Sequence, residues 1–85
     1  MSKTIRSIGH KALCQAIVGA RKRSGLSQEQ LAERLHCQQS LVARIESEER
    51  RIDVVELIVI CRALGVDPEE ILRVTEAATQ RDHYL

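Results

Sequence analysis

An 85-residue chain has room for one small domain with a modest hydrophobic core. Apolar residues make up 44% of it, but it has no Phe or Trp and one Tyr, so the core must be built from aliphatic side chains. No apolar run approaches the roughly 20 residues that a membrane span needs, and no signal-peptide pattern is present, so we expect a cytoplasmic protein. The net charge is +1, yet the first 25 residues contain no acidic side chain, and this basic segment suits a polyanionic partner.

The three cysteines fit neither a CxxC pair nor a zinc site. Cys14, Cys37 and Cys61 are spaced 23 and 24 residues apart, whereas zinc ligands come in closely spaced pairs. Cys14 and Cys61 lie within apolar helical patterns and are expected to be buried, reduced thiols. Cys37 lies in a turn, where a redox-sensing role is a second hypothesis. We expect no metal ion and no cofactor.

Residues 1–9 show no helical period, and Gly9 interrupts them, so we interpret them as a basic N-terminal arm. The arm is either a solvated terminus or a means for Lys3 and Arg6 to reach a polyanion. Apolar side chains at helical spacing then predict a first helix over about residues 10–23. Its buried face would hold Leu13, Ile17 and Ala20.

Two short helices are predicted next. Gly25 ends the first helix, and Ser27 with Gln30 forms a capping box for the second. This second helix, about residues 28–35, and a third, about residues 39–47, are joined by a turn of about three residues. Two short helices joined by a tight turn are typical of a helix-turn-helix.

The third helix has two chemically different sides. Val42 and Ile45 lie three residues apart and are expected to face inward. The outer side then carries Gln39, Ser40, Ala43 and Arg44. Side chains of these kinds can recognise the edges of nucleic-acid bases, so this side is a candidate base-reading face.

A second capping box, Asp53 with Glu56, predicts a fourth helix over about residues 54–64. Asp67 caps a fifth helix, with Pro68 in its first position. The fourth helix has more apolar residues than one buried face can hold, and the remainder form either a dimer interface, part of the monomer core or ordinary surface. The candidate interface consists of Val55, Ile58 and Val59, together with Val66 and the fifth helix.

Four blocks of sequence, in this order and spacing, resemble the phage-repressor or Xre-like helix-turn-helix family. They are Arg21 four residues before Gly25, LSQEQLA at 26–32, QSLVARIE at 39–46 and RALGVDPEEIL at 62–72. The resemblance covers roughly residues 13–72. It implies an all-α, compact five-helix domain like that of lambda repressor. The helical pattern places this domain at residues 10–74, with residues 75–85 as a tail or helix extension.

The resemblance also implies residue roles on double-stranded DNA. Gln39 would read an adenine through its N6 and N7 atoms. Gln28 would donate to a phosphate and brace Gln39, and Arg21 with Glu46 would form a structural ion pair. The other base contacts would come from Ser40, Arg44, Ala43 and Leu41, the last two on thymine methyl groups. Further backbone contacts would come from Arg50, Arg51 and Lys22.

Three positions depart from the family's pattern. His36 stands in the turn where glycine is common, so we expect a left-handed residue that costs on the order of 1 kcal/mol. Gln38 replaces the usual Ser or Thr cap, which predicts a weakly capped third helix. Glu48 stands where glycine is common after the third helix, and with Glu49 it adds negative charge near the expected phosphates.

These observations predict a sequence-specific transcriptional regulator that binds a palindromic operator as a homodimer, with RNA polymerase as a further candidate partner. The alternative is an antitoxin or anti-regulator whose main role is to bind a protein, which the low net charge and the two acidic residues at 48 and 49 favour. An enzyme is not expected, because His10, His36 and His83 do not pair with Cys or acidic residues at a catalytic spacing.

Overall fold

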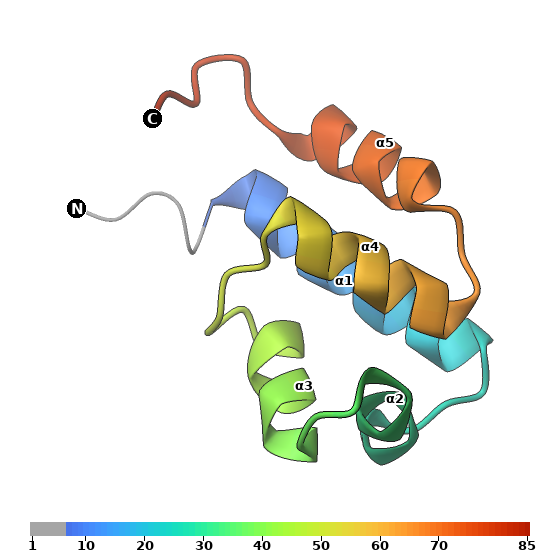
Figure 1. Cartoon of the computed structure of the whole chain (residues 1–85). Coiled ribbons are helices and arrows are strands. Elements are labelled where there is room, and N and C mark those ends of the chain that lie inside the picture. Colours follow the sequence, from blue (N-terminus) through green and yellow to red (C-terminus); the bar gives the residue numbers. More distant parts are fainter. Residues whose placement is uncertain (1–6) are drawn as a thin grey trace.

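Residues 7–85 are described by the computed structural model, and five helices make up most of them. In chain order they are α1 (Ile8–Arg23), α2 (Gln28–Leu35), α3 (Gln39–Glu46), α4 (Val54–Leu64) and α5 (Pro68–Ala78). This part of the chain contains no strand (Figure 1). The expected all-α, five-helix architecture is therefore confirmed. Lys3 and Arg6 of the basic arm lie outside the described residues.

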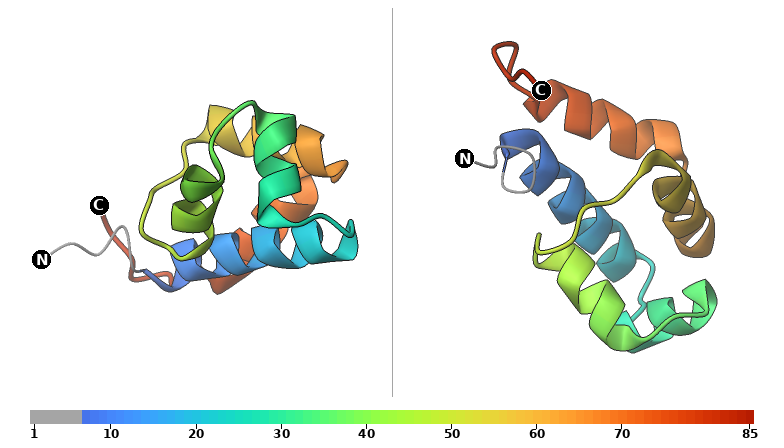
Figure 2. Two further views of the ribbon diagram at one scale, coloured as in Figure 1. Left: turned by 90° about the horizontal axis from the view of Figure 1, so that it is seen from below. Right: turned by 60° about the vertical axis from the view of Figure 1, so that its left-hand side comes forward.

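The helices pack so that α2 and α3 project together. α5 packs along α1, and α1 also contacts α3 (Figures 1 and 2). α2 contacts both α3 and α4. The two short helices therefore lie side by side below the longer ones in Figure 1, which leaves one side of the pair free of the rest of the domain.

The core between these helices is aliphatic, as the composition predicts. Its buried residues are Cys14, Ile17, Ala20, Leu31, Ala32, Val42, Ile45, Leu57, Ile60, Cys61, Leu64 and Ile71. Leu13 was expected among them and is only half-buried, although it packs against the same cluster. Burial of this apolar surface is the main force that holds the five helices together.

α1 begins at Ile8, two residues earlier than expected. Ser7 is its N-cap, and the Ser7 hydroxyl accepts a hydrogen bond from the backbone N–H of His10 at 3.1 Å. Gly9 does not interrupt the chain but is buried in the first turn of the helix, so that interpretation of Gly9 was wrong. A Cβ atom on Gly9 would lie 2.5 Å from Thr79 Oγ1, so glycine is needed where the chain passes the end of α5.

The other helix ends follow the local signals. Both bonds of the capping box are present at Ser27 and Gln30, and both are present at Asp53 and Glu56. Pro68 occupies the first turn of α5, as predicted. These residues fix where α2, α4 and α5 begin.

Three further findings concern membrane spans, free thiols and metal sites. No helix within residues 7–85 is long and apolar enough to cross a bilayer. Cys14 and Cys61 are buried free thiols, as expected, and Cys37 is a half-buried free thiol. Within the same residues, no group of three or more His, Cys, Asp or Glu side chains is arranged to hold a metal ion.

Candidate nucleic-acid interface

α2 and α3 are joined by a tight turn around a small buried residue. Ala32 is 3% exposed, and Val42 and Ile45 on the inner side of α3 are buried as expected. α2 ends at Leu35 with His36 as its C-cap, and the backbone N–H of Cys37 then donates to the Ala32 carbonyl oxygen at 3.0 Å. The pair therefore has the helix-turn-helix geometry that the sequence predicts.

The departures at His36 and Gln38 have the structural effects that the sequence predicts, and Glu48 adds a positive φ that was not predicted. His36 and Glu48 have φ values of 57° and 71°, a region where a side chain costs energy and glycine does not. Gln38 precedes α3 in an extended conformation, but its side chain makes no capping hydrogen bond. The turn and the start of α3 are thus less stable than they would be with residues typical of the family.

The outer side of α3 presents polar side chains to solvent. Gln39, Ser40 and Arg44 are exposed, and Ala43 is half-buried. Leu41 does not belong to this face, because it packs against the hydrophobic core and lines a groove beside α4. The expected contact of Leu41 with a thymine methyl group is therefore withdrawn.

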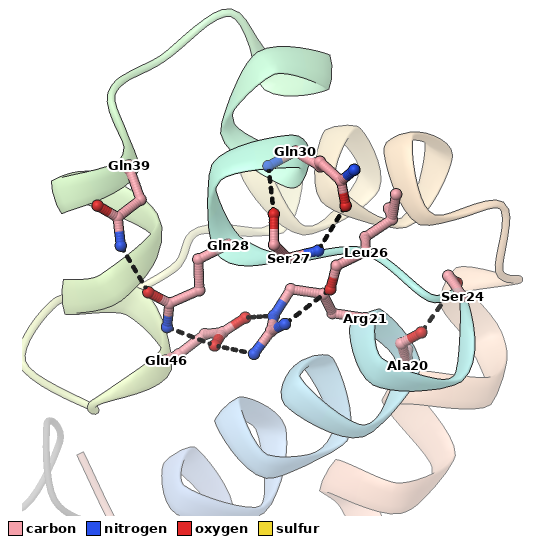
Figure 3. A network of polar contacts seen from close by, with 9 residues as sticks. All are labelled: Ala20, Arg21, Ser24, Leu26, Ser27, Gln28, Gln30, Gln39 and Glu46. Atoms are coloured by element: carbon pink, nitrogen blue, oxygen red, sulfur yellow. Dashed lines mark hydrogen bonds and ion pairs between the residues drawn. The ribbon is translucent and has the colours of Figure 1, made fainter.

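Four side chains link the interior to this outer face, and we call them the polar chain: Arg21, Glu46, Gln28 and Gln39 (Figure 3). Arg21 Nε lies 2.7 Å from Glu46 Oε2, and Arg21 Nη2 donates to Glu46 Oε1 at 3.0 Å, so the expected ion pair is present. Glu46 Oε1 also accepts from Gln28 Nε2 at 2.9 Å. Gln28 Oε1 in turn accepts from Gln39 Nε2 at 2.9 Å.

The inner end of the polar chain is well enclosed. The side chains of Arg21 and Glu46 are 11% and 5% exposed. Arg21 Nη1 also donates to the Leu26 carbonyl oxygen at 2.8 Å, which ties the link before α2 to the same ion pair (Figure 3). With each of its three guanidinium nitrogens hydrogen-bonded, Arg21 is a fixed anchor for the exposed end at Gln39.

The two arginines after α3 are placed differently, although the sequence suggests the same role for both. Arg50 Nη2 lies 2.7 Å from Glu56 Oε2, and Arg50 Nη1 donates to Glu56 Oε1 and to the Arg51 carbonyl oxygen. The Arg50 guanidinium keeps the pKa of Glu56 below its usual value. Arg51 is exposed. Arg50 therefore braces the loop, and Arg51 is the better placed of the two for an external anion.

The last turn of α1 carries three basic residues. Arg21 turns inward to its ion pair, whereas Lys22 and Arg23 are exposed. Positive charge in this turn also interacts favourably with the negative end of the helix dipole. Lys22 therefore has a stabilising position independently of any contact with a phosphate.

The candidate interface residues on and after α4 are only partly exposed. Val55 and Val59 are 70% and 45% exposed, Ile58 is half-buried, and Val66 packs against the core. Val55 and Val59 also line an open apolar groove of about 190 Å³ between α4 and the α2–α3 turn. Val54 on α4, which was not expected at the interface, is also exposed, and so are Leu72 and Val74 on α5, the helix that was expected there.

These features define a helix-turn-helix domain: two helices joined by a tight turn, a small residue where they touch, and a polar face on the outer side of the second helix. Such a domain presents its second helix to a duplex. The chain belongs to the Xre family of these proteins. Residues 19–71 match the family profile described as helix-turn-helix. An XRE-family-like protein from Pseudomonas syringae pv. tomato str. DC3000 is 41% identical, with a TM-score of 0.80 over 92% of this chain and 95% of that chain.

Two other solved structures are similar. The restriction-modification controller protein C.AhdI from Aeromonas hydrophila is 30% identical, with a TM-score of 0.65 over 69% of this chain and 86% of that one. The clp gene regulator ClgR from C. glutamicum, at 19% identity, shares the fold with a TM-score of 0.77 over 91% of this chain and 100% of that one. A search of curated proteins gave no significant match. The family makes this chain a DNA-binding transcriptional regulator and not an enzyme.

Proposed function

We propose that the protein is a sequence-specific regulator that acts in the cytoplasm and binds a palindromic operator as a homodimer, with α3 of each copy in the major groove. The hydrogen bond from Gln39 to Gln28 carries this proposal. It orders an exposed amide at the first position of α3 before a duplex is bound. A side chain that is ordered in advance loses less entropy when it makes its contact.

The base contacts would come from the outer side of α3. Gln39 would pair its amide with N6 and N7 of an adenine, a contact that discriminates between bases by about 1–3 kcal/mol. Arg44 is exposed on the same helix and is suited to O6 and N7 of a guanine. Ser40 would contact a neighbouring base, and Ala43 a thymine methyl group.

The backbone contacts would hold α3 in register. Gln28 has a second amide hydrogen beyond the one given to Glu46, and it lies at the start of α2, where the helix dipole favours an anion. Arg51 and Lys22 are exposed and would contact phosphates. Arg50 would contribute mainly by bracing the loop that carries Arg51. Bound at a promoter, the protein would regulate by covering it or by contacting RNA polymerase.

A homodimer is proposed because one α3 covers only a few base pairs, and two half-sites about one helical turn apart are the usual solution. Val55 and Val59 are the best placed interface residues, since both are exposed on α4. Ile58 and Val66 would lie at the edge of the interface. Burial of these apolar side chains would favour association.

Selection of bound duplexes from a random pool, followed by gel-shift titration, tests the proposal. We expect a palindromic site with half-sites about 10 base pairs apart, two protein copies per duplex, and tighter binding than to a shuffled duplex at every salt concentration. Equal binding to selected and shuffled duplexes would overturn the proposal. A stable complex with a different protein in a pull-down, together with equal binding, would support the antitoxin or anti-regulator alternative.

A further inference from the structure

We infer that Glu46 determines base specificity, because it fixes which way the amide of Gln39 points. The inference rests on the proposed function, in which Gln39 reads a base. It gives a second role to a residue that otherwise belongs to a structural ion pair. The Glu46 side chain is enclosed between α2, α3 and α1 and would not touch the duplex, so Glu46 is a positioning residue (Figure 3).

Glu46 decides which group donates and which accepts at each hydrogen bond of the polar chain. A carboxylate paired with a guanidinium offers only acceptors. Its Oε1 takes one hydrogen from Arg21 and another from Gln28 Nε2. If Gln28 were flipped, its carbonyl oxygen would face the carboxylate oxygen, and two acceptors would lie together with little water to separate them. Gln28 must therefore turn its NH₂ group toward Glu46.

The same direction passes on to Gln39. With the NH₂ group of Gln28 turned inward, the carbonyl oxygen of Gln28 faces α3. Gln39 must therefore present its NH₂ group to this oxygen as a hydrogen-bond donor. The oxygen and nitrogen of a primary amide have nearly the same shape, so hydrogen-bond partners alone decide between the two orientations. The charge at Glu46 thus selects one of two otherwise similar orientations at Gln39.

The selected orientation favours adenine over guanine. One N–H of Gln39 is taken by Gln28, and the second N–H and the carbonyl oxygen remain for a base. Adenine presents an acceptor at N7 and a donor at N6, which match this pair. Guanine presents acceptors at both N7 and O6, so the Gln39 carbonyl oxygen would face an acceptor. If the amide were free to turn, it could place donors toward guanine.

The test compares base preferences in a panel of duplexes. The selected duplex is changed to each of the four bases at each half-site position, and the position read by Gln39 is the one where Gln39→Ala removes the preference. Glu46→Gln keeps the shape of the side chain but can donate or accept. Glu33→Gln, exposed on α2, loses the same charge outside the polar chain and is the matched control. Circular dichroism is used to check that each variant is folded at the temperature of the assay.

For the wild type and Glu33→Gln we expect adenine to be preferred over guanine by roughly 5- to 150-fold at that position. For Glu46→Gln the ratio should fall toward one. If Glu46→Gln binds more weakly but keeps the ratio, Glu46 acts only through stability and the inference is overturned. If Gln39→Ala changes no position, the proposed reading role of Gln39 fails, and the inference fails with it.

A second variant covers the case in which Glu46→Gln does not fold. Gln28→Met leaves the Arg21 and Glu46 ion pair in place and removes the acceptor that orients Gln39. We expect the same loss of adenine preference, on top of a general loss of affinity from the missing phosphate contact. A retained ratio in Gln28→Met would overturn the inference.

Discussion

Gln39 Nε2 donates to Gln28 Oε1 across 2.9 Å, so the first residue of α3 is tied to the first residue of α2. The tie continues inward through Glu46 to Arg21 on α1 (Figure 3). The exposed face of α3 is therefore anchored in the interior of the domain. Substitutions at buried positions of this polar chain should change stability and DNA binding together.

The Arg21–Glu46 and Arg50–Glu56 ion pairs should differ in their effect on stability. Arg21→Met leaves the Glu46 carboxylate buried without its counter-charge, and we expect the free energy of unfolding to fall by about 3–5 kcal/mol. Arg50→Met breaks a pair whose side chains are 35% and 37% exposed, and the expected loss is about 1 kcal/mol or less. Urea unfolding followed by circular dichroism measures both. Equal losses would show that burial does not distinguish the two pairs.

Glycine in the turn should stabilise the domain. His36 has a φ of 57°, so His36→Gly removes a strain of about 1 kcal/mol and should raise the melting temperature. Glu33→Gly, within α2, is the control. It should lower stability by about 1 kcal/mol, because a glycine inside a helix loses more backbone freedom on folding than the residue it replaces. A melting temperature that falls in His36→Gly would mean that the imidazole makes a contact worth more than the strain.

The two loop arginines should differ in the salt dependence of DNA binding. Arg51→Gln removes an exposed positive charge, and the slope of log affinity against log salt should become shallower by about 0.9 if it contacts one phosphate. Arg50→Gln should change the slope less, because Glu56 already compensates this charge within the protein. Titrations at four salt concentrations give the slopes. If both variants make the slope shallower by the same amount, Arg50 also contacts a phosphate.

Stability should fall in alkaline solution because of Cys14. Burial raises the pKa of this thiol to about 11 from 9.0, so between these values the unfolded chain releases a proton that the folded protein keeps. Stability is therefore lost as the pH rises through this window. We expect a decline on the order of 2 kcal/mol from pH 8.5 to pH 10.5 that Cys14→Ala reduces. Urea unfolding in reducing buffer at the two pH values tests this, and an equal decline in the variant would assign the effect to other groups.

Much of the fold could be predicted because its signals are local. Ser27 with Gln30 and Asp53 with Glu56 fix two helix starts within four residues of sequence. Gly9 was misinterpreted because its role depends on a contact with Thr79, at the other end of the chain. The earlier start of α1 did have a local signal, a serine at position 7 that could act as the N-cap.

The residues of the candidate site could be predicted more readily than their partners. Helical periodicity placed Gln39 and Arg44 outside and Val42 inside without any knowledge of the fold. Arg50 and Arg51 have the same charge and adjacent positions, and what separates them is that the Glu56 side chain caps α4 and also reaches back to Arg50. No sequence pattern reports such a shared acceptor, because it depends on the path of the loop.

Whether the exposed face of α3 meets the duplex can be measured directly by titrating ¹⁵N-labelled protein with the selected duplex and following the amide resonances. We expect the largest changes at the side-chain amides of Gln28 and Gln39, the backbone amides of Ser40 and Arg44, and the loop at Arg51. A shuffled duplex should produce smaller changes at Gln39. Large changes confined to α5, with Gln39, Ser40 and Arg44 unaffected, would contradict DNA recognition through α3.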